Sequence, residues 1–147
     1  MNSQTIIKHE LILFYMIKFF ILCAEGLEDV AIEEIKEFGV VENIEKFSNV
    51  VLFDFSGDYK KLIELKTVDD ILVLVKKFHD ITRYEKSLFF IKKELSQVNL
   101  MKTLFTCRKV RITNPNTSFS IQSSYQGRRD YTAKDITSTV RRAILKN

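Results

Sequence analysis

The chain has 147 residues, of which 46% are hydrophobic and 29% are charged, and its formal net charge is +4 at pH 7. This composition supports a buried core in one domain or in two small ones. The two cysteines, Cys23 and Cys107, stand far apart and outside any CxxC pair. Their positions argue against a disulfide framework and a structural zinc site, and they favour a cytoplasmic protein.

The first apolar segment covers residues 11–23 and reads LILFYMIKFFILC, interrupted only by Lys18. A membrane span needs about 20 apolar residues, so this segment is too short to cross a bilayer. No A-x-A-like cleavage site follows it. We therefore expect residues 17–23 to form a buried first strand and residues 1–16 to be an N-terminal extension, with no membrane partner.

The next elements alternate between helix and strand. An amphipathic helix with an acidic first turn is expected to stop at Gly39, and two strands join tightly at Ser48–Asn49. The helix, the two strands, a short helix and a last strand are expected over residues 27–38, 41–47, 49–55, 58–66 and 69–78. The order βαββαβ predicts an α+β protein that begins with a ferredoxin-like domain over residues 17–82.

Residues 83–147 read as a second region of helices and strands. The expected elements are a long helix, a strand, a second strand and a C-terminal helix over residues 84–104, 105–113, 119–125 and 132–146. Two strands are too few to cover two helices, so we expect an incomplete α/β domain. An open sheet of this kind predicts a dimer through strand pairing between chains.

The most informative segment runs from the second of these strands into the last helix. Arg128 and Arg129 follow the strand, and Thr132 with Asp135 three residues later predicts a capping box. The free N–H groups and the positive dipole end of a helix N-terminus favour a phosphate beside the two arginines. An isolated arginine pair in a turn is more often simply solvated.

Charge asymmetry argues against simple solvation here. Residues 1–83 hold 10 basic and 15 acidic side chains, whereas residues 84–147 hold 13 basic and 4 acidic ones, a net charge of +9. The positive charge of residues 84–147 predicts an anionic partner. Nucleic acid is favoured over an anionic membrane, because the last helix carries mainly small and β-branched apolar residues and a membrane-binding helix needs bulky ones. The expected contacts are Arg128, Arg129, Tyr131, Lys134, Arg141, Arg142 and Lys146, with a weaker set in Arg108, Lys109 and Arg111, where strand alternation places Lys109 opposite the other two.

Two motifs resemble one known family. Residues 20–39, FILCAEGLEDVAIEEIKEFG, are similar to the opening of THUMP-containing RNA methyltransferases, and residues 119–144, with the core SYQGRRDYTAKDI, resemble the strand, turn and helix of a THUMP domain. The resemblance implies a truncated THUMP domain after the ferredoxin-like one. It implies a module that binds structured RNA, typically tRNA at its acceptor end, for a methyltransferase of the guanine-N2 type.

The chain departs from that family in lacking the catalytic domain. It has four isolated glycines and one proline, so it contains neither a GxGxG cofactor loop nor a Pro-Pro catalytic motif. We expect no cofactor in this chain and no catalytic residue, while the resemblance implies S-adenosylmethionine for the missing domain. Glu33 and Glu34 are expected on a solvated helix face.

Three alternatives remain open from the sequence. The first is the N-terminal part of a THUMP-containing 4-thiouridine synthetase, although Gly-Leu-Glu at residues 26–28 favours the methyltransferases. The second is a protein-interaction or structural module whose basic half meets an acidic partner. The third is a fragment without function.

Overall fold

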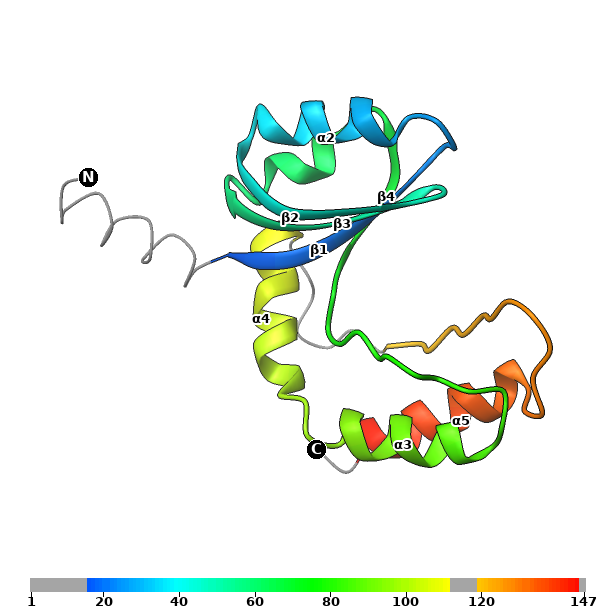
Figure 1. The fold of residues 1–147 in the computed structure, drawn as a ribbon. Coiled ribbons are helices and arrows are strands. Elements are labelled where there is room, and N and C mark those ends of the chain that lie inside the picture. Colours follow the sequence, from blue (N-terminus) through cyan, green and yellow to red (C-terminus); the bar gives the residue numbers. More distant parts are fainter. Residues whose placement is uncertain (1–15, 112–118, 146–147) are drawn as a thin grey trace, which may run out of the picture. The chain divides into compact units, whose positions relative to one another are not determined.

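The computed structural model describes residues 16–111 and 119–145 (Figure 1). These residues form two compact units, one of residues 16–74 with 105–111 and one of residues 75–104 with 119–145. The first unit holds a four-stranded antiparallel sheet and the second is mainly helical. The α+β class is confirmed, whereas the expected N-terminal extension and Lys146 lie outside the described residues.

The sheet forms from residues whose apolar side chains alternate along each strand. Its strands are β1 (Ile17–Cys23), β2 (Gly39–Phe47), β3 (Val50–Gly57) and β4 (Val68–Val73). Their order is β2-β3-β1-β4, and every neighbouring pair is antiparallel. β1 lies in the interior of this sheet because it is apolar at almost every position and pairs on both sides, which suits a strand with little solvent contact.

One face of the sheet carries the core of the first unit. Helix α2 (Glu28–Lys36) and the 3-10 helix η1 (Lys61–Glu64) cover this face (Figure 1). The short helix is thus a single 3-10 turn inside the expected span, and β4 ends earlier than predicted. The buried cluster consists of Phe19, Ile21, Ala31, Ile32, Ile35, Val51, Phe53, Phe55, Leu62 and Val110.

Two carboxylates of α2 fix the connections of this unit. Glu28 accepts hydrogen bonds from the backbone N–H groups of Gly26 and Asn49, both at 2.9 Å. Glu34 accepts from the backbone N–H groups of Lys66 and Thr67 and from the Thr67 hydroxyl at 2.8, 3.1 and 2.6 Å. Glu34 therefore anchors the entry to β4, and the expectation of a purely solvated residue was wrong for it.

The second unit is built on the packing of α3 (Lys86–Leu95) against α5 (Ala133–Ile144). The expected long helix over residues 84–104 is broken, because Asn99 accepts a hydrogen bond from the Lys102 backbone N–H at 3.1 Å and starts a new helix. That helix, α4 (Leu100–Val110), occupies most of the segment predicted as the strand 105–113. The strand prediction was therefore wrong for residues 105–110, and Val110 at the end of α4 is buried in the core of the first unit.

The segment 119–126 is not assigned as a strand, so the second strand prediction was also wrong. The Ser123 hydroxyl donates to the Ala133 carbonyl at 2.7 Å and lies 2.6 Å from the Thr137 hydroxyl. The segment is therefore attached to α5 by a side chain, whereas a strand would be held by a ladder of backbone bonds. Within the described ranges, no helix combines the length and the apolar character that crossing a membrane requires.

Candidate functional site

The N-terminus of α5 is capped as the sequence predicts. The Thr132 hydroxyl accepts a hydrogen bond from the Asp135 backbone N–H at 3.3 Å, and the Asp135 carboxylate accepts from the Thr132 backbone N–H at 2.8 Å. Hydrogen bonds from the Thr132 hydroxyl and backbone hold the pKa of Asp135 below its ordinary value. A carboxylate thus already occupies this positive helix end, which leaves less of it for a phosphate than the sequence suggests.

The two arginines of the turn before α5 have different environments. Gly127 turns the chain with φ +78°, Arg128 is exposed, and Arg129 is half-buried. Arg129 directs one terminal nitrogen, Nη1, toward the carbonyl oxygen of Ile81 at 3.5 Å, and its Nε is buried with no hydrogen-bond partner among the described residues. Arg128 is therefore open to a ligand, while much of Arg129 is enclosed by the protein.

Tyr131 is a structural residue of the second unit. It is only 5% exposed, and its hydroxyl donates to the carbonyl oxygen of Thr82 at 3.1 Å. The same Thr82 is bonded to the buried Ser87 through its backbone N–H, at 3.0 Å. The expected contact of Tyr131 with RNA does not fit this burial, because the polar tip of the side chain is already bonded inside the protein.

The exposed cations of α5 form what we call the basic face, Lys134, Arg141 and Arg142. Lys134 and Arg141 are seven residues apart, which places them on one side of the helix about 10 Å apart along its axis. None of the three has an ion-pair partner within the part of the chain that the structure describes. Unpaired charges of one sign on one face are suited to an anionic ligand.

The weaker set belongs to α4 and its C-terminal end, in the first unit. The Arg111 guanidinium lies 3.6 Å from the Asp70 carboxylate, and the Lys109 ammonium lies over the ring of Tyr59 at 5.7 Å from its centre. Arg108 is exposed. Two of the three cations are thus engaged within their own unit, which leaves Arg108 as the most accessible of the set.

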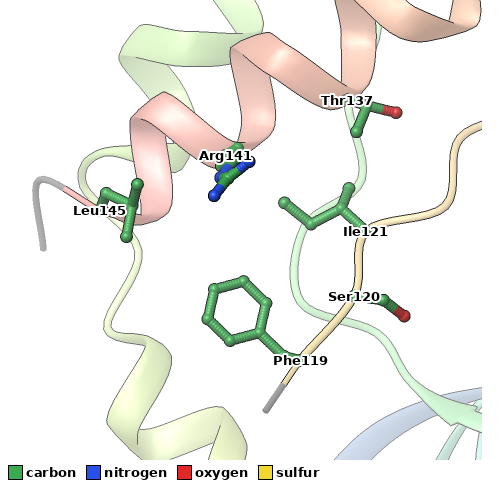
Figure 2. A pocket seen from close by; sticks show the side chains of 6 residues that line it. All are labelled: Phe119, Ser120, Ile121, Thr137, Arg141 and Leu145. Carbon is green, nitrogen blue, oxygen red and sulfur yellow. The ribbon is translucent and has the colours of Figure 1, made fainter.

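A pocket of about 510 Å³ lies between α5 and the segment 119–121 (Figure 2). It is lined by Phe119, Ser120, Ile121, Thr137, Arg141 and Leu145. Sequence reasoning placed only Arg141 at a site. Thr137, Arg141 and Leu145 recur at helical spacing, and Phe119 alternates with Ile121. Each spacing places its residues on one side of its segment, but the sequence does not show that the two sides meet.

Metal-ligating groups and reactive thiols are two other kinds of site that side chains of the described residues could form. Within residues 16–111 and 119–145, no group of three or more His, Cys, Asp or Glu side chains is placed to hold a metal ion. Burial raises the pKa of the Cys107 thiol, which makes this cysteine a poor nucleophile near neutral pH, and burial also raises the pKa of the Cys23 thiol. The binding features above are therefore the strongest candidates for function.

Comparison with known proteins finds solved structures that share the fold of this chain. Neither a family model nor a curated protein sequence matches the chain. A solved structure described as a predicted N6-adenine-specific DNA methylase from Listeria monocytogenes strain 4b F2365 matches 92% of the chain with a TM-score of 0.63 and 14% identity. A possible methylase from Clostridium difficile 630 matches 89% with a TM-score of 0.56 and 15% identity. This chain spans 32% of each of those two chains, so it shares the fold of about a third of each.

Proposed function

We propose that the chain is the RNA-binding part of a base-modifying enzyme, an RNA methyltransferase that uses S-adenosylmethionine in a catalytic domain outside this chain. Its RNA is a structured one, of the tRNA type. The observation that carries the proposal is the basic face of α5, Lys134, Arg141 and Arg142, which has no ion-pair partner among the described residues, together with the exposed Arg128. Exposed, unpaired cations of this kind neutralise backbone phosphates and release counterions.

The architecture agrees with the domain assignment. In the first unit, the antiparallel order β2-β3-β1-β4 with helices on one face supports the proposed ferredoxin-like, or split βαβ, domain. The Gly-Leu-Glu motif acquires a structural role there, since Gly26 has φ +89° and Glu28 fixes two turns. In the second unit, the assignment to a partial THUMP domain rests on the capped helix α5 and the turn before it.

The structural neighbours favour a methyltransferase over a 4-thiouridine synthetase. Both neighbours are described as methylases, and each has about two thirds of its length outside the match. One of them is described as acting on DNA, so duplex DNA is the second candidate ligand. A cationic face alone does not distinguish the two, because both present regularly spaced phosphates.

Salt-dependent binding tests the proposal. The full chain is titrated into a labelled tRNA-like hairpin and into a DNA duplex of the same sequence, and the fluorescence anisotropy is followed over a series of salt concentrations. We expect tighter binding to the hairpin. The combined variant Arg128→Ala, Lys134→Ala, Arg141→Ala and Arg142→Ala should flatten the slope of log K against log salt by about 3 units, because each phosphate contact contributes about 0.7–0.9.

A matched control uses cations that are already paired. Lys36 and Lys46 are exposed but bonded to Glu33 and Asp29 at 2.6 and 2.8 Å. The double variant Lys36→Ala and Lys46→Ala should keep the wild-type slope. A loss in the double variant of about half that in the fourfold variant, in proportion to the cations removed, would indicate a nonspecific effect of net charge. Binding to an acidic protein without binding to RNA would favour the interaction module instead.

A further inference from the structure

We infer that the pocket between α5 and residues 119–121 holds one unpaired nucleotide of the RNA, with its base against Phe119 and its phosphate on Arg141. This inference rests on the proposed function. It adds that the protein recognises an unpaired base as well as the charge of the phosphates. A volume of about 510 Å³ falls within the usual range of small-ligand sites, about 300–1,000 Å³, which accommodates a single nucleotide.

The walls of the pocket are apolar and accessible. The Phe119 side chain is 63% exposed and that of Leu145 is 69% exposed, although both are large apolar groups. Figure 2 shows the Phe119 ring, the Leu145 side chain and Ile121 around one space, with the Arg141 guanidinium above it. An aromatic ring that stays in solvent next to a cation offers the stacking surface that single-stranded nucleic acids use.

Two residues of the pocket lining, Ser120 and Thr137, carry hydroxyls. The Ser123 hydroxyl donates its hydrogen to the Ala133 carbonyl, so the Thr137 hydroxyl is the donor in the bond between Thr137 and Ser123. The Thr137 hydroxyl points away from the pocket and its methyl group faces Ile121 (Figure 2). Apart from the Ser120 hydroxyl, the pocket thus combines apolar walls with one permanent cation.

That chemistry favours a nucleotide over the other occupants. An apolar peptide would leave the Arg141 guanidinium buried without a partner, which costs free energy. A second copy of this chain that paired symmetrically through this face would bring its own basic half toward Lys134 and Arg142, and like charges repel. A nucleotide combines a flat apolar base with an anion, so it complements both the walls and the charge.

Two labelled RNAs test the inference, a hairpin with a short single-stranded overhang and the same hairpin with a blunt end. The full chain should bind the overhang hairpin more tightly. Phe119→Ala should weaken binding of the overhang hairpin about 5-fold or more and leave the blunt hairpin unchanged, because base–aromatic stacking contributes about 1–3 kcal/mol per base. A 2-aminopurine in the overhang should lose fluorescence on binding to wild type and keep it with Phe119→Ala.

Matched controls separate the pocket from general effects. Phe89, on α3, is 74% exposed and lies outside the pocket, so Phe89→Ala should bind both RNAs like wild type. Arg142 neighbours Arg141 but does not line the pocket, so Arg142→Ala should weaken the two RNAs equally, whereas Arg141→Ala should weaken the overhang hairpin more. Circular dichroism checks that each variant is folded.

The outcomes distinguish this inference from the proposed function. Equal binding of both hairpins, unchanged by Phe119→Ala, overturns the nucleotide pocket and leaves the RNA-binding function standing. Binding of neither hairpin overturns both. Sedimentation that shows a dimer dispersed by Phe119→Ala, with no preference for the overhang, would assign the pocket to a second copy and overturn the inference.

Discussion

At the scale of single residues, Gly39 and Gly57 face each other where β2 pairs with β3. A Cβ on Gly57 would lie 2.5 Å from the carbonyl oxygen of Phe38, and a Cβ on Gly39 would lie 2.5 Å from that of Ser56. Gly39 was expected to stop the preceding helix. Glycine is needed at position 39 because the backbones of β2 and β3 approach each other closely there. The sequence around Gly39 does not reveal this contact.

We expect Gly57→Ala to destabilise the first unit by about 2–3 kcal/mol, because a backbone carbonyl cannot move aside cheaply. Gly26→Ala is the control. A Cβ at position 26 would meet no atom, but the backbone there has a positive φ that alanine disfavours. We expect Gly26→Ala to lower the free energy of unfolding by about 1–2 kcal/mol. Urea denaturation followed by far-UV circular dichroism measures both. A Gly57→Ala protein as stable as wild type would show that the two strands separate there.

Glu34 predicts a dependence of stability on pH. Burial alone would raise its pKa, but hydrogen bonds from the Thr67 hydroxyl and from the backbone N–H groups of Lys66 and Thr67 outweigh that effect and hold the pKa below the ordinary 4.5. A lowered folded-state pKa means that Glu34 stabilises the fold above pH 4.5 and loses this contribution as the pH falls through the folded-state value.

The test compares Glu34→Gln with wild type. At neutral pH the variant should be less stable, and the difference in free energy of unfolding should shrink steadily below pH 4.5. Glu33→Gln is the control, since Glu33 is exposed and bonded only to Lys36 in the described structure. A difference that stays constant between neutral and acidic pH would mean that the Glu34 carboxylate does not hold the entry to β4.

At the scale of elements, the cap of α5 was predictable because it is encoded within four residues. Replacing Thr132 by Ala removes the hydroxyl that accepts from Asp135, and we expect a loss of about 1 kcal/mol. Faster amide hydrogen exchange in the first turn of α5 should accompany it. Ser138→Ala, at an exposed position of the same helix, should change neither quantity. If both variants behave alike, the capping box does not stabilise α5 in solution.

Helix α4 covers residues for which the local sequence pattern predicted a strand. Phe105, Thr106 and Cys107 have side chains common in strands, yet the less exposed positions 100, 103, 107 and 110 recur at helical spacing. Val110, at the end of this helix, is buried in the core of the first unit.

Val110→Ala should therefore destabilise the sheet unit, by about 1–2 kcal/mol. Arg108→Ala, two positions earlier and exposed, should leave its stability within about 0.5 kcal/mol of wild type. Denaturation curves of the two variants provide the comparison. An unchanged midpoint for Val110→Ala would mean that residues 105–110 do not belong to the core of the first unit.

At the scale of the whole molecule, the sequence lacks two motifs that accompany S-adenosylmethionine-dependent catalysis in the family it resembles. We expect isothermal titration with S-adenosylmethionine to give no stoichiometric heat, because the sequence holds neither a GxGxG loop nor a Pro-Pro motif. Addition of the RNA hairpin in the same buffer serves as the positive control. A stoichiometric signal with the cofactor would place a cofactor site in this chain and would require a different assignment.

The sequence by itself determined the strands of the first unit, the turn at Ser48–Asn49, the capping box at Thr132 and the charge asymmetry. These features depend on residues close together along the chain, where alternation, turn chemistry and capping act directly. The strand pairing decided why Gly39 and Gly57 must be glycines.

The tertiary structure alone decided which cations are available. It encloses much of Arg129, bonds Tyr131 to Thr82, pairs Arg111 with Asp70, and leaves Arg128 and the basic face of α5 exposed. It also gathers Phe119, Arg141 and Leu145 around one pocket. Such outcomes depend on contacts between residues far apart in the chain, and a charged or aromatic residue has no local signal that tells whether its side chain will be buried, paired or free.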